Sequence, residues 1–391
     1  MSFPDGISRR QFVKSAGAVV AGACMGRSLL MADETPPPVF LKSWEVVEIA
    51  SLVGKSKQAM KIIASNGEFG ICKLIGGCKD LKGVEEIGRK NNLLDHEKLH
   101  DAMTAAKANR GQLTTFDIAC WDLHARMLKK PLHAVLGTKR TKILRYGDVR
   151  GQQPDFSPEK YAKQVAAYLD RSKLQATKLH FPGAMGTKES IEFKVVLETL
   201  RQVRKAVGAE RMLAWDPYPG SAESATTSVA EAKEIIGLMD ELGYAWIEGP
   251  LPPMPFEEQI PKYVELMKTK PKLRIQAEGP GSPISDGTPF DVMKQWVEAG
   301  AVNQCSTDAY IAAGLTNAYR FLEYARKNRD RKLVINLHWE WAPHAHLAMA
   351  YEEEIMPVGE FVWGSEVPKE YMDGPYLKAP DWPGIYKIDN A

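Results

Sequence analysis

Residues 212–248 read MLAWDPYPGSAESATTSVAEAKEIIGLMDELGYAWIE. A short apolar run ends at Asp216, a polar loop and an amphipathic helical pattern follow, and a second apolar run ends at Glu248. Units of strand, loop and helix are typical of proteins with a parallel sheet. Because the same texture continues from Leu144 onward, we expect an α/β protein built around a (β/α) barrel.

Polar residues recur at the ends of successive apolar runs, at intervals of 32, 30, 30 and 30 residues. In chain order they are Asp216, Glu248, Glu278, Asp308 and His338. One βα unit takes about 30 residues, so these side chains fall at the same end of neighbouring strands, where barrel active sites lie. A single acid at such a position is often a helix N-cap, but five in phase indicate a shared site.

Three of the five are carboxylates on consecutive predicted strands. Asp216, Glu248 and Glu278 would repel one another and raise one another's pKa values unless a cation lay between them. Three oxygen ligands without Cys or His suit Mg²⁺ better than zinc. The spacing therefore predicts a magnesium site.

The chain before the barrel has a different texture. Apolar runs at 46–53, 58–63 and 69–75, separated by turn residues, predict a small antiparallel sheet, and residues 95–136 carry a long helical pattern. We therefore expect a modified (β/α) TIM-type barrel with an N-terminal α+β capping domain. The expected boundaries are 1–35 for a signal and linker, 36–142 for the cap, 143–365 for the barrel and 366–391 for a segment returning to the cap.

The charge composition indicates which class of ligand the protein binds. Fifty-one basic and 49 acidic residues leave a net charge of +2, so no global field favours nucleic acid or an anionic membrane. A small molecule is the expected ligand, and we expect a homo-oligomer. The five cysteines show no zinc-finger spacing, and a disulfide between Cys72 and Cys78 is left open.

The N-terminus resembles a twin-arginine export signal. Residues 8–14 read SRRQFVK and precede an apolar run over 15–25 that is too short for a permanent membrane span. We expect a periplasmic protein. An ordinary basic N-terminus is the alternative, and Cys24 leaves a lipoprotein open.

Two motifs resemble the mandelate racemase and muconate lactonizing branch of the enolase superfamily. They are TTFDIACWDLHARMLKKPLHAVLG at Thr114–Gly137 and WIEGPLPP at Trp246–Pro253, within a resemblance that covers most of the chain. The resemblance implies Mg²⁺ bound by the three carboxylates and a catalytic pair of Asp308 and His338. It places His346 at a structural helical position.

The same family carries Lys-x-Lys on its second barrel strand, where this chain reads ATKLHF, with Lys178 and His180 on one face of the strand. The resemblance implies that Lys178 neutralises a substrate carboxylate and that His180 is an acid or base; a structural histidine is the alternative. We expect Lys178 to lower the pKa of His180. The missing second lysine argues against racemisation.

The resemblance also implies an acid on the last barrel strand that hydrogen-bonds the substrate. VGEFVW makes Glu360 the candidate, with Glu352 and Glu354 left open. Together these residues imply Mg²⁺-dependent removal of the proton alpha to a carboxylate, via an enediolate. Polar and aromatic residues beside the predicted site, among them Arg150, Tyr218, Trp339 and Trp341, favour dehydration of a sugar acid to a 2-keto-3-deoxy acid. A racemase, epimerase or cycloisomerase is the alternative enzyme, and an exported sugar-acid binding protein is the alternative outside enzymes.

Replacing both Arg9 and Arg10 by lysine is expected to leave the protein in the cytoplasm with its first 32 or so residues attached, because the pair is an address read by the export machinery. Cell fractionation and the mass of the recovered chain measure this, with Arg27→Lys as the control. Unchanged export of the double variant would show that another pathway reads this segment.

Overall fold

The structure, a computed structural model, describes residues 36–49, 58–151, 156–181, 192–217, 228–252, 254–277, 290–310, 312–339, 341–361 and 367–388. The chain divides into Met1–Pro38 and a unit over Val39–Ala391, to which every helix and strand named below belongs. The predicted export signal, with Arg9, Arg10 and Cys24, lies outside the described residues. None of the described helices is long and apolar enough to cross a membrane.

Eight parallel strands form the barrel among the described residues. They are β4 (Lys142–Arg150), β5 (Ala176–His180), β6 (Met212–Asp216), β7 (Trp246–Glu248), β8 (Arg274–Gln276), β9 (Gln304–Thr307), β10 (Val334–Leu337) and β11 (Val358–Glu360). Each strand from β4 to β9 pairs in parallel with the strand that follows it. Because β11 pairs with β4 and also contacts β10, the strands close into a ring, which confirms the predicted barrel.

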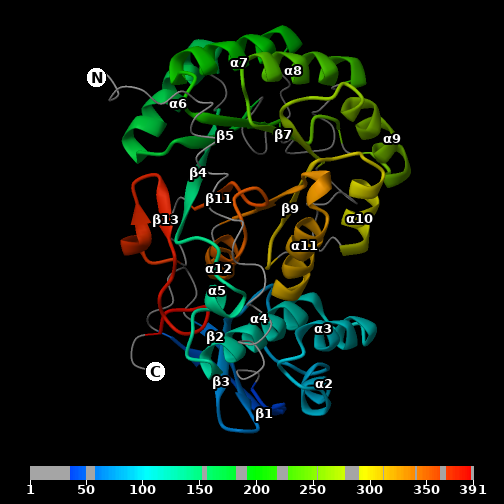
Figure 1. Cartoon of the computed structure of the whole chain (residues 1–391), viewed down its shortest axis with the longest axis vertical. Coiled ribbons are helices and arrows are strands. Elements are labelled where there is room, and N and C mark those ends of the chain that lie inside the picture. Colours follow the sequence, from blue (N-terminus) through cyan, green and yellow to red (C-terminus); the bar gives the residue numbers. More distant parts are fainter. Residues whose placement is uncertain are drawn as a thin grey trace, which may run out of the picture. The chain divides into compact units, whose positions relative to one another are not determined.

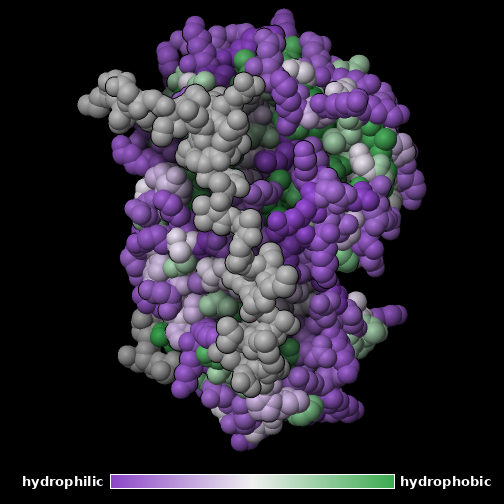
Figure 2. All heavy atoms as spheres, in the orientation of Figure 1, coloured by the Kyte–Doolittle hydropathy of each residue, from purple (hydrophilic) through white to green (hydrophobic). Residues whose placement is uncertain are grey.

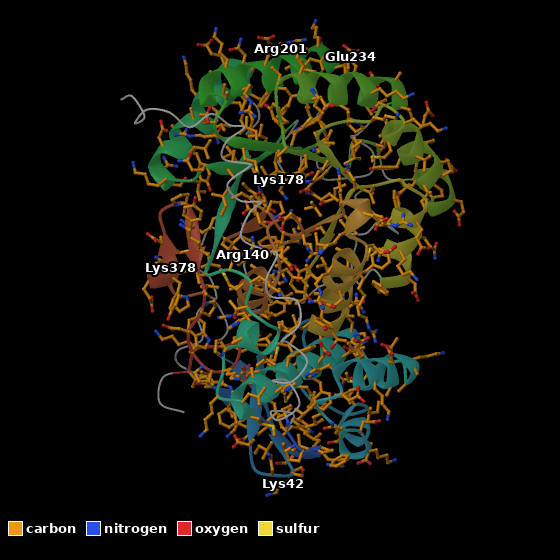
Figure 3. All side chains as sticks on the ribbon, viewed as in Figure 1. Lys42, Arg140, Lys178, Arg201, Glu234 and Lys378 are labelled. Carbon is orange, nitrogen blue, oxygen red and sulfur yellow. The ribbon has the colours of Figure 1, made fainter. Side chains whose placement is uncertain are left out.

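Helices connect these strands and cover them on the outside (Figure 1). They are α6 (Pro158–Ser172), α7 (Phe193–Val207), α8 (Val229–Glu241), α9 (Phe256–Met267), α10 (Phe290–Glu298), α11 (Leu315–Lys327) and α12 (Ala342–Ala350). In α7, Val196, Leu200 and Val203 recur at helical spacing and are buried, whereas Arg201 points outward (Figure 3). The outer faces are accordingly mostly hydrophilic (Figure 2).

The interior of the barrel is filled by side chains. Tyr146, Ala176, Ala214, Trp246 and Val358 form a separate buried cluster. Small alanines next to two large rings let the layer fill the space, and the Tyr146 and Trp246 rings meet edge to face at 5.4 Å. This packed floor supports the polar groups at the carboxyl ends of the strands.

The cap contains a three-stranded antiparallel sheet, as predicted. Its strands are β1 (Leu41–Glu48), β2 (Gln58–Ala64) and β3 (Phe69–Lys73), and its helices are α2 (Glu85–Lys90), α3 (His96–Ala105), α4 (Arg110–Met127) and α5 (Leu132–Val135). β1 begins earlier than the predicted run because Leu41 turns inward while polar neighbours mask the pattern. At Gly70 an added Cβ would lie 2.1 Å from the carbonyl oxygen of Ala119, so only glycine lets β3 pack against α4.

A buried carboxylate of the cap caps a barrel helix. α11 has no side-chain N-cap of its own, and Asp117 on α4 instead accepts a hydrogen bond from the backbone N–H of Thr316 at 2.9 Å. The indole of Trp121 donates to the Thr316 hydroxyl at 2.9 Å. Gly314 has a φ of 111° and a Cβ there would lie 2.6 Å from the Asp117 carboxylate, so this close approach requires glycine.

The C-terminal segment adds an antiparallel hairpin to β4. It comprises the 3₁₀ helix η2 (Lys369–Tyr371), β12 (Met372–Asp373) and β13 (Tyr376–Lys378); a second 3₁₀ helix, η1 (Arg329–Arg331), precedes β10. Beyond the hairpin, the N–H of Ile385 donates to Asp122 of α4, and its carbonyl accepts from Nε2 of His346 at 3.0 Å. Cys72 and Cys78 are buried free thiols, so the disulfide that was left open is not formed.

His346 gives the folded state a pH dependence that can be measured. Burial lowers its pKa to about 3, against about 6.5 in an unfolded chain. The stabilising effect of the neutral ring is therefore complete above about pH 6.5 and is lost as pH falls toward the folded pKa, by roughly 1 kcal/mol per pH unit. We expect urea unfolding at pH 7 and pH 5 to show a smaller pH-dependent loss in His346→Gln than in the wild type. Equal losses would contradict this assignment.

Candidate active site

The first two predicted metal ligands lie together at the carboxyl end of the barrel. Asp216 ends β6 and Glu248 ends β7, and both are 3% exposed. The Trp246 indole donates to Glu248 Oε1 at 2.8 Å. Burial raises the pKa of Glu248, which Lys178 offsets only in part. Glu278, the third predicted ligand, lies outside the described residues, two positions after β8 ends at Gln276.

Lys178 lies between these carboxylates, inside the ring of strands (Figure 3). Its Nζ atom is 3.2 Å from Glu248 Oε2 and 3.8 Å from Asp216 Oδ2. Burial opposes the ammonium charge, but Glu248 and Asp148 outweigh it and raise the pKa of Lys178 well above its usual value. The lysine is therefore a buried cation held by acids.

His180 ends β5 and contacts two carboxylates. Its Nδ1 is 3.3 Å from Asp216 Oδ2, and its Nε2 is 3.2 Å from Asp148 Oδ2. Burial lowers the pKa of His180, and Lys178 acts in the same direction, as expected, but Asp216 and Asp148 outweigh both, so the net pKa of His180 is raised instead of lowered.

Asp148, on β4, was not predicted as a site residue. A signal for it existed, since it lies 30 residues before Lys178 and is paired with it in the strand register. It sits two residues before the end of its strand, as Lys178 does, whereas the predicted series was counted at strand ends.

The predicted pair of Asp308 and His338 is also brought together. Asp308 directly follows β9 and His338 directly follows β10, with His338 Nδ1 3.5 Å from Asp308 Oδ2. The Trp341 indole donates to the same oxygen at 2.9 Å, and the Tyr310 N–H donates to Oδ1 at 2.7 Å. Burial would raise the pKa of Asp308, but His338, His344 and the Trp341 bond lower it. An ionised Asp308 can therefore fix the orientation of the His338 ring.

Glu360 is the best placed of the three acids considered for the last strand. Its Oε2 accepts hydrogen bonds from the Tyr146 hydroxyl and the Trp339 N–H, each at 3.2 Å. Glu352 instead pairs with Arg329 on the surface at 2.6 Å, and Glu354 is exposed. Glu360 thus lies beside the residue that follows His338.

Tyr146 on β4 connects the two sides of the site and was not predicted. Its hydroxyl donates to Glu360 and accepts from the Asn336 amide at 2.9 Å, and its ring centre lies 6.0 Å from Lys178 Nζ. Burial raises its pKa well above the usual value, so the hydroxyl stays a proton donor.

A cleft of about 500 Å³ borders this region. Its described lining residues are Lys73, Leu74, Ile75, Gly76, Asn109, Arg110, Gly111, Thr114, Tyr310 and Trp341. Trp341 and Tyr310 both bond Asp308, so the cleft and the Asp308–His338 pair share a wall. The buried Thr114 hydroxyl has no hydrogen-bond partner among the described residues. Of the other residues singled out near the site, Arg150 is exposed and Tyr218 lies outside the described residues.

The donor set fits a hard divalent cation. No group of three or more His, Cys, Asp or Glu side chains that could hold a metal occurs among the described residues, which do not include Glu278. Asp216 and Glu248 nevertheless present buried carboxylates on adjacent strands, with Lys178 as their counterion. Two such oxygen donors suit Mg²⁺ better than a softer metal.

A family model described as "Enolase C-terminal domain-like" matches residues 160–385. The chain belongs to the enolase superfamily. Its solved structural relatives lie in the mandelate racemase and muconate lactonizing branch, as the sequence predicts.

Three solved structures show how far this superfamily fold is shared. D-glucarate dehydratase from Agrobacterium tumefaciens, complexed with magnesium, is 20% identical over 90% of this chain and 94% of that one, with a TM-score of 0.65. L-talarate dehydratase from Polaromonas sp., complexed with Mg and L-glucarate, is 19% identical over 90% and 96%, at 0.64. Dipeptide epimerase from Cytophaga hutchinsonii is 18% identical over 90% and 94%, at 0.62.

Proposed function

We propose that this protein is a Mg²⁺-dependent enzyme that removes the proton alpha to the carboxylate of a sugar acid and expels the β-hydroxyl. The product would be a 2-keto-3-deoxy acid. One observation carries the proposal: a buried Lys178 lies between Asp216 and Glu248, while Asp308 holds His338 on the same end of the barrel. We also propose that the enzyme is exported, on the basis of Arg9 and Arg10.

Asp216, Glu248 and Glu278 would hold the metal ion. When bound, Mg²⁺ would stabilise the negative charge that develops on the substrate carboxylate as the α-proton leaves. Lys178 contributes a second positive charge in a site shielded from water, where it acts more strongly than in solution.

His338 is the proposed proton acceptor. Asp308 contacts its Nδ1, which leaves Nε2 for the substrate, and the side chain is 31% exposed. The C–H bond breaks as the proton passes to the imidazole, and its electron pair is delocalised into the carboxylate, which gives the enediolate. That pair then forms the double bond between the α- and β-carbons as the β-hydroxyl takes a proton and leaves as water, and the resulting enol tautomerises to the keto acid.

The cleft supports a hydroxylated, anionic substrate. Lys73 and Arg110 place two cations at its lining, and Tyr310 and Trp341 add two aromatic rings. The talarate dehydratase relative is complexed with L-glucarate, a molecule of this kind. Epimerisation is the second candidate because His180 supplies a second imidazole beside the carboxylates.

Glu248→Gln is expected to weaken Mg²⁺ binding at least about tenfold, since it removes a buried anionic ligand. Isothermal titration of the metal-free protein with Mg²⁺ measures this. Glu234→Gln, on the outer face of α8, is the control and should bind like the wild type (Figure 3). Equal affinity in both variants would remove Glu248 from the metal site.

His338→Asn is expected to abolish formation of 2-keto acids from a library of aldonic and aldaric acids, with a loss of about 100-fold or more, while Mg²⁺ still binds. A chromogenic test for 2-keto acids and α-proton exchange in D₂O give the rates, with His124→Asn in the cap as the control. Exchange and epimer formation without keto acid in the wild type would establish an epimerase instead. Binding of an acid without exchange would establish a binding protein.

A further inference from the structure

His180 has a carboxylate close to each of its ring nitrogens, and its Nε2 makes no hydrogen bond among the described residues. Asp216 contacts Nδ1 at 3.3 Å, and Asp148 contacts Nε2 at 3.2 Å. Asp216 is a proposed metal ligand, so its carboxylate would bind the metal ion as well as contact His180. Asp148 contacts no proposed metal ligand in the described structure, and the contact with His180 is its nearest ion pair.

The Asp148–His180 contact resembles the Asp308–His338 pair, but the aspartate contacts the opposite ring nitrogen of the histidine. Asp308 contacts His338 through Nδ1, which leaves Nε2 toward the site. Asp148 contacts His180 through Nε2, which leaves Nδ1 on the side of Asp216 and Lys178. A carboxylate behind an imidazole fixes which nitrogen faces the reacting atoms.

We propose that Asp148 is the positioning residue of a second aspartate–histidine pair, which holds His180 with Nδ1 toward the substrate. The proposal rests on the function proposed above, in which His338 serves the other side of the substrate. Strands β4 and β11 lie between the strands that carry the two histidines, so the two rings approach the barrel mouth from separate directions.

Charge and burial favour this role over a purely structural ion pair. The Asp148 side chain is 16% exposed and that of His180 is 15% exposed, so the contact is shielded from solvent. Burial opposes ionisation of Asp148, but Lys178 and His180 hold its pKa below the usual range. Asp148 Oδ1 and His180 Nε2 are both buried without a hydrogen-bond partner among the described residues, so the contact between the two side chains is a close ion pair and no other hydrogen bond holds either atom.

The Asp308–His338 and Asp148–His180 pairs would each carry out one of the two proton transfers of the proposed reaction. One imidazole accepts the proton from the α-carbon, and the other donates the proton with which the β-hydroxyl leaves as water. The missing second lysine of the family pattern is then replaced by a histidine with its own carboxylate. A substrate whose α-hydrogen and β-hydroxyl lie on opposite faces fits this arrangement.

The test compares the Mg²⁺-loaded wild type with Asp148→Ala, Asp148→Asn and a control, Asp170→Asn, whose carboxylate lies on the surface of α6. Crystal structures should show His180 fixed in the wild type and control, retained in Asp148→Asn through the amide oxygen, and turned away or in several orientations in Asp148→Ala. On an acid that the wild type dehydrates, kcat should fall about 10- to 100-fold in Asp148→Ala, less in Asp148→Asn, with KM and Mg²⁺ affinity within about threefold.

Three results would overturn the inference. The first is an unchanged His180 orientation in Asp148→Ala, which needs no substrate and decides the pairing even if no acid is turned over. The second is a kcat for Asp148→Ala within threefold of the wild type when His180→Asn is impaired. The third is a loss of Mg²⁺ affinity in Asp148→Ala as large as in Asp216→Asn, which would make Asp148 part of the metal site. Failure of the proposed function appears separately, as a wild type that exchanges no α-proton.

Discussion

The positive charge of Lys178 stabilises the group of buried carboxylates that forms the site. The residue is 3% exposed, and a cation buried to this extent is stable only among anions that compensate for its lost hydration. Glu248 and Asp216 supply them within 4 Å, and the strand register puts Asp148 beside it on the next strand. The same carboxylates, without this lysine, would repel one another. Cation and acids are therefore a single unit that forms only when β4 to β7 are in register.

That register depends on the packed floor beneath it. Tyr146 and Trp246 fill the barrel between small alanines, and both also reach upward to the site: the tyrosine hydroxyl bonds Glu360, and the indole bonds Glu248. A buried aromatic with a polar edge can satisfy packing and hydrogen bonding at once. The core of this barrel therefore orients its acids directly.

Much of this could be predicted because a (β/α) barrel repeats its geometry at nearly constant chain length. The recurrence of polar residues from Asp216 to His338 predicted the barrel, and in the structure Asp216, Glu248, Asp308 and His338 lie at or just beyond strand ends. Glu278 stays a prediction. Asp148 was missed because the series was counted at strand ends, whereas Asp148 lies two residues before the end of β4, next to Lys178 on β5. Tyr146 was missed because its contacts with Glu360 and Asn336 join strands far apart in sequence. The pKa of His180 was misjudged for the same reason, since only Lys178 was visible as a neighbour.

The bond from Asp117 to the start of α11 has a consequence for how this architecture can be re-engineered. The segment that leads into α11 also carries Asp308 and Tyr310, so a residue of the cap stabilises the stretch of backbone that presents a barrel carboxylate. A barrel transplanted onto a foreign cap would lose this N-cap, worth about 1 kcal/mol, and gain an unsatisfied helix start next to its reactive centre. Chimeras of such enzymes should therefore exchange α4 together with the Gly314–Thr316 turn, as one module spanning both parts of the chain.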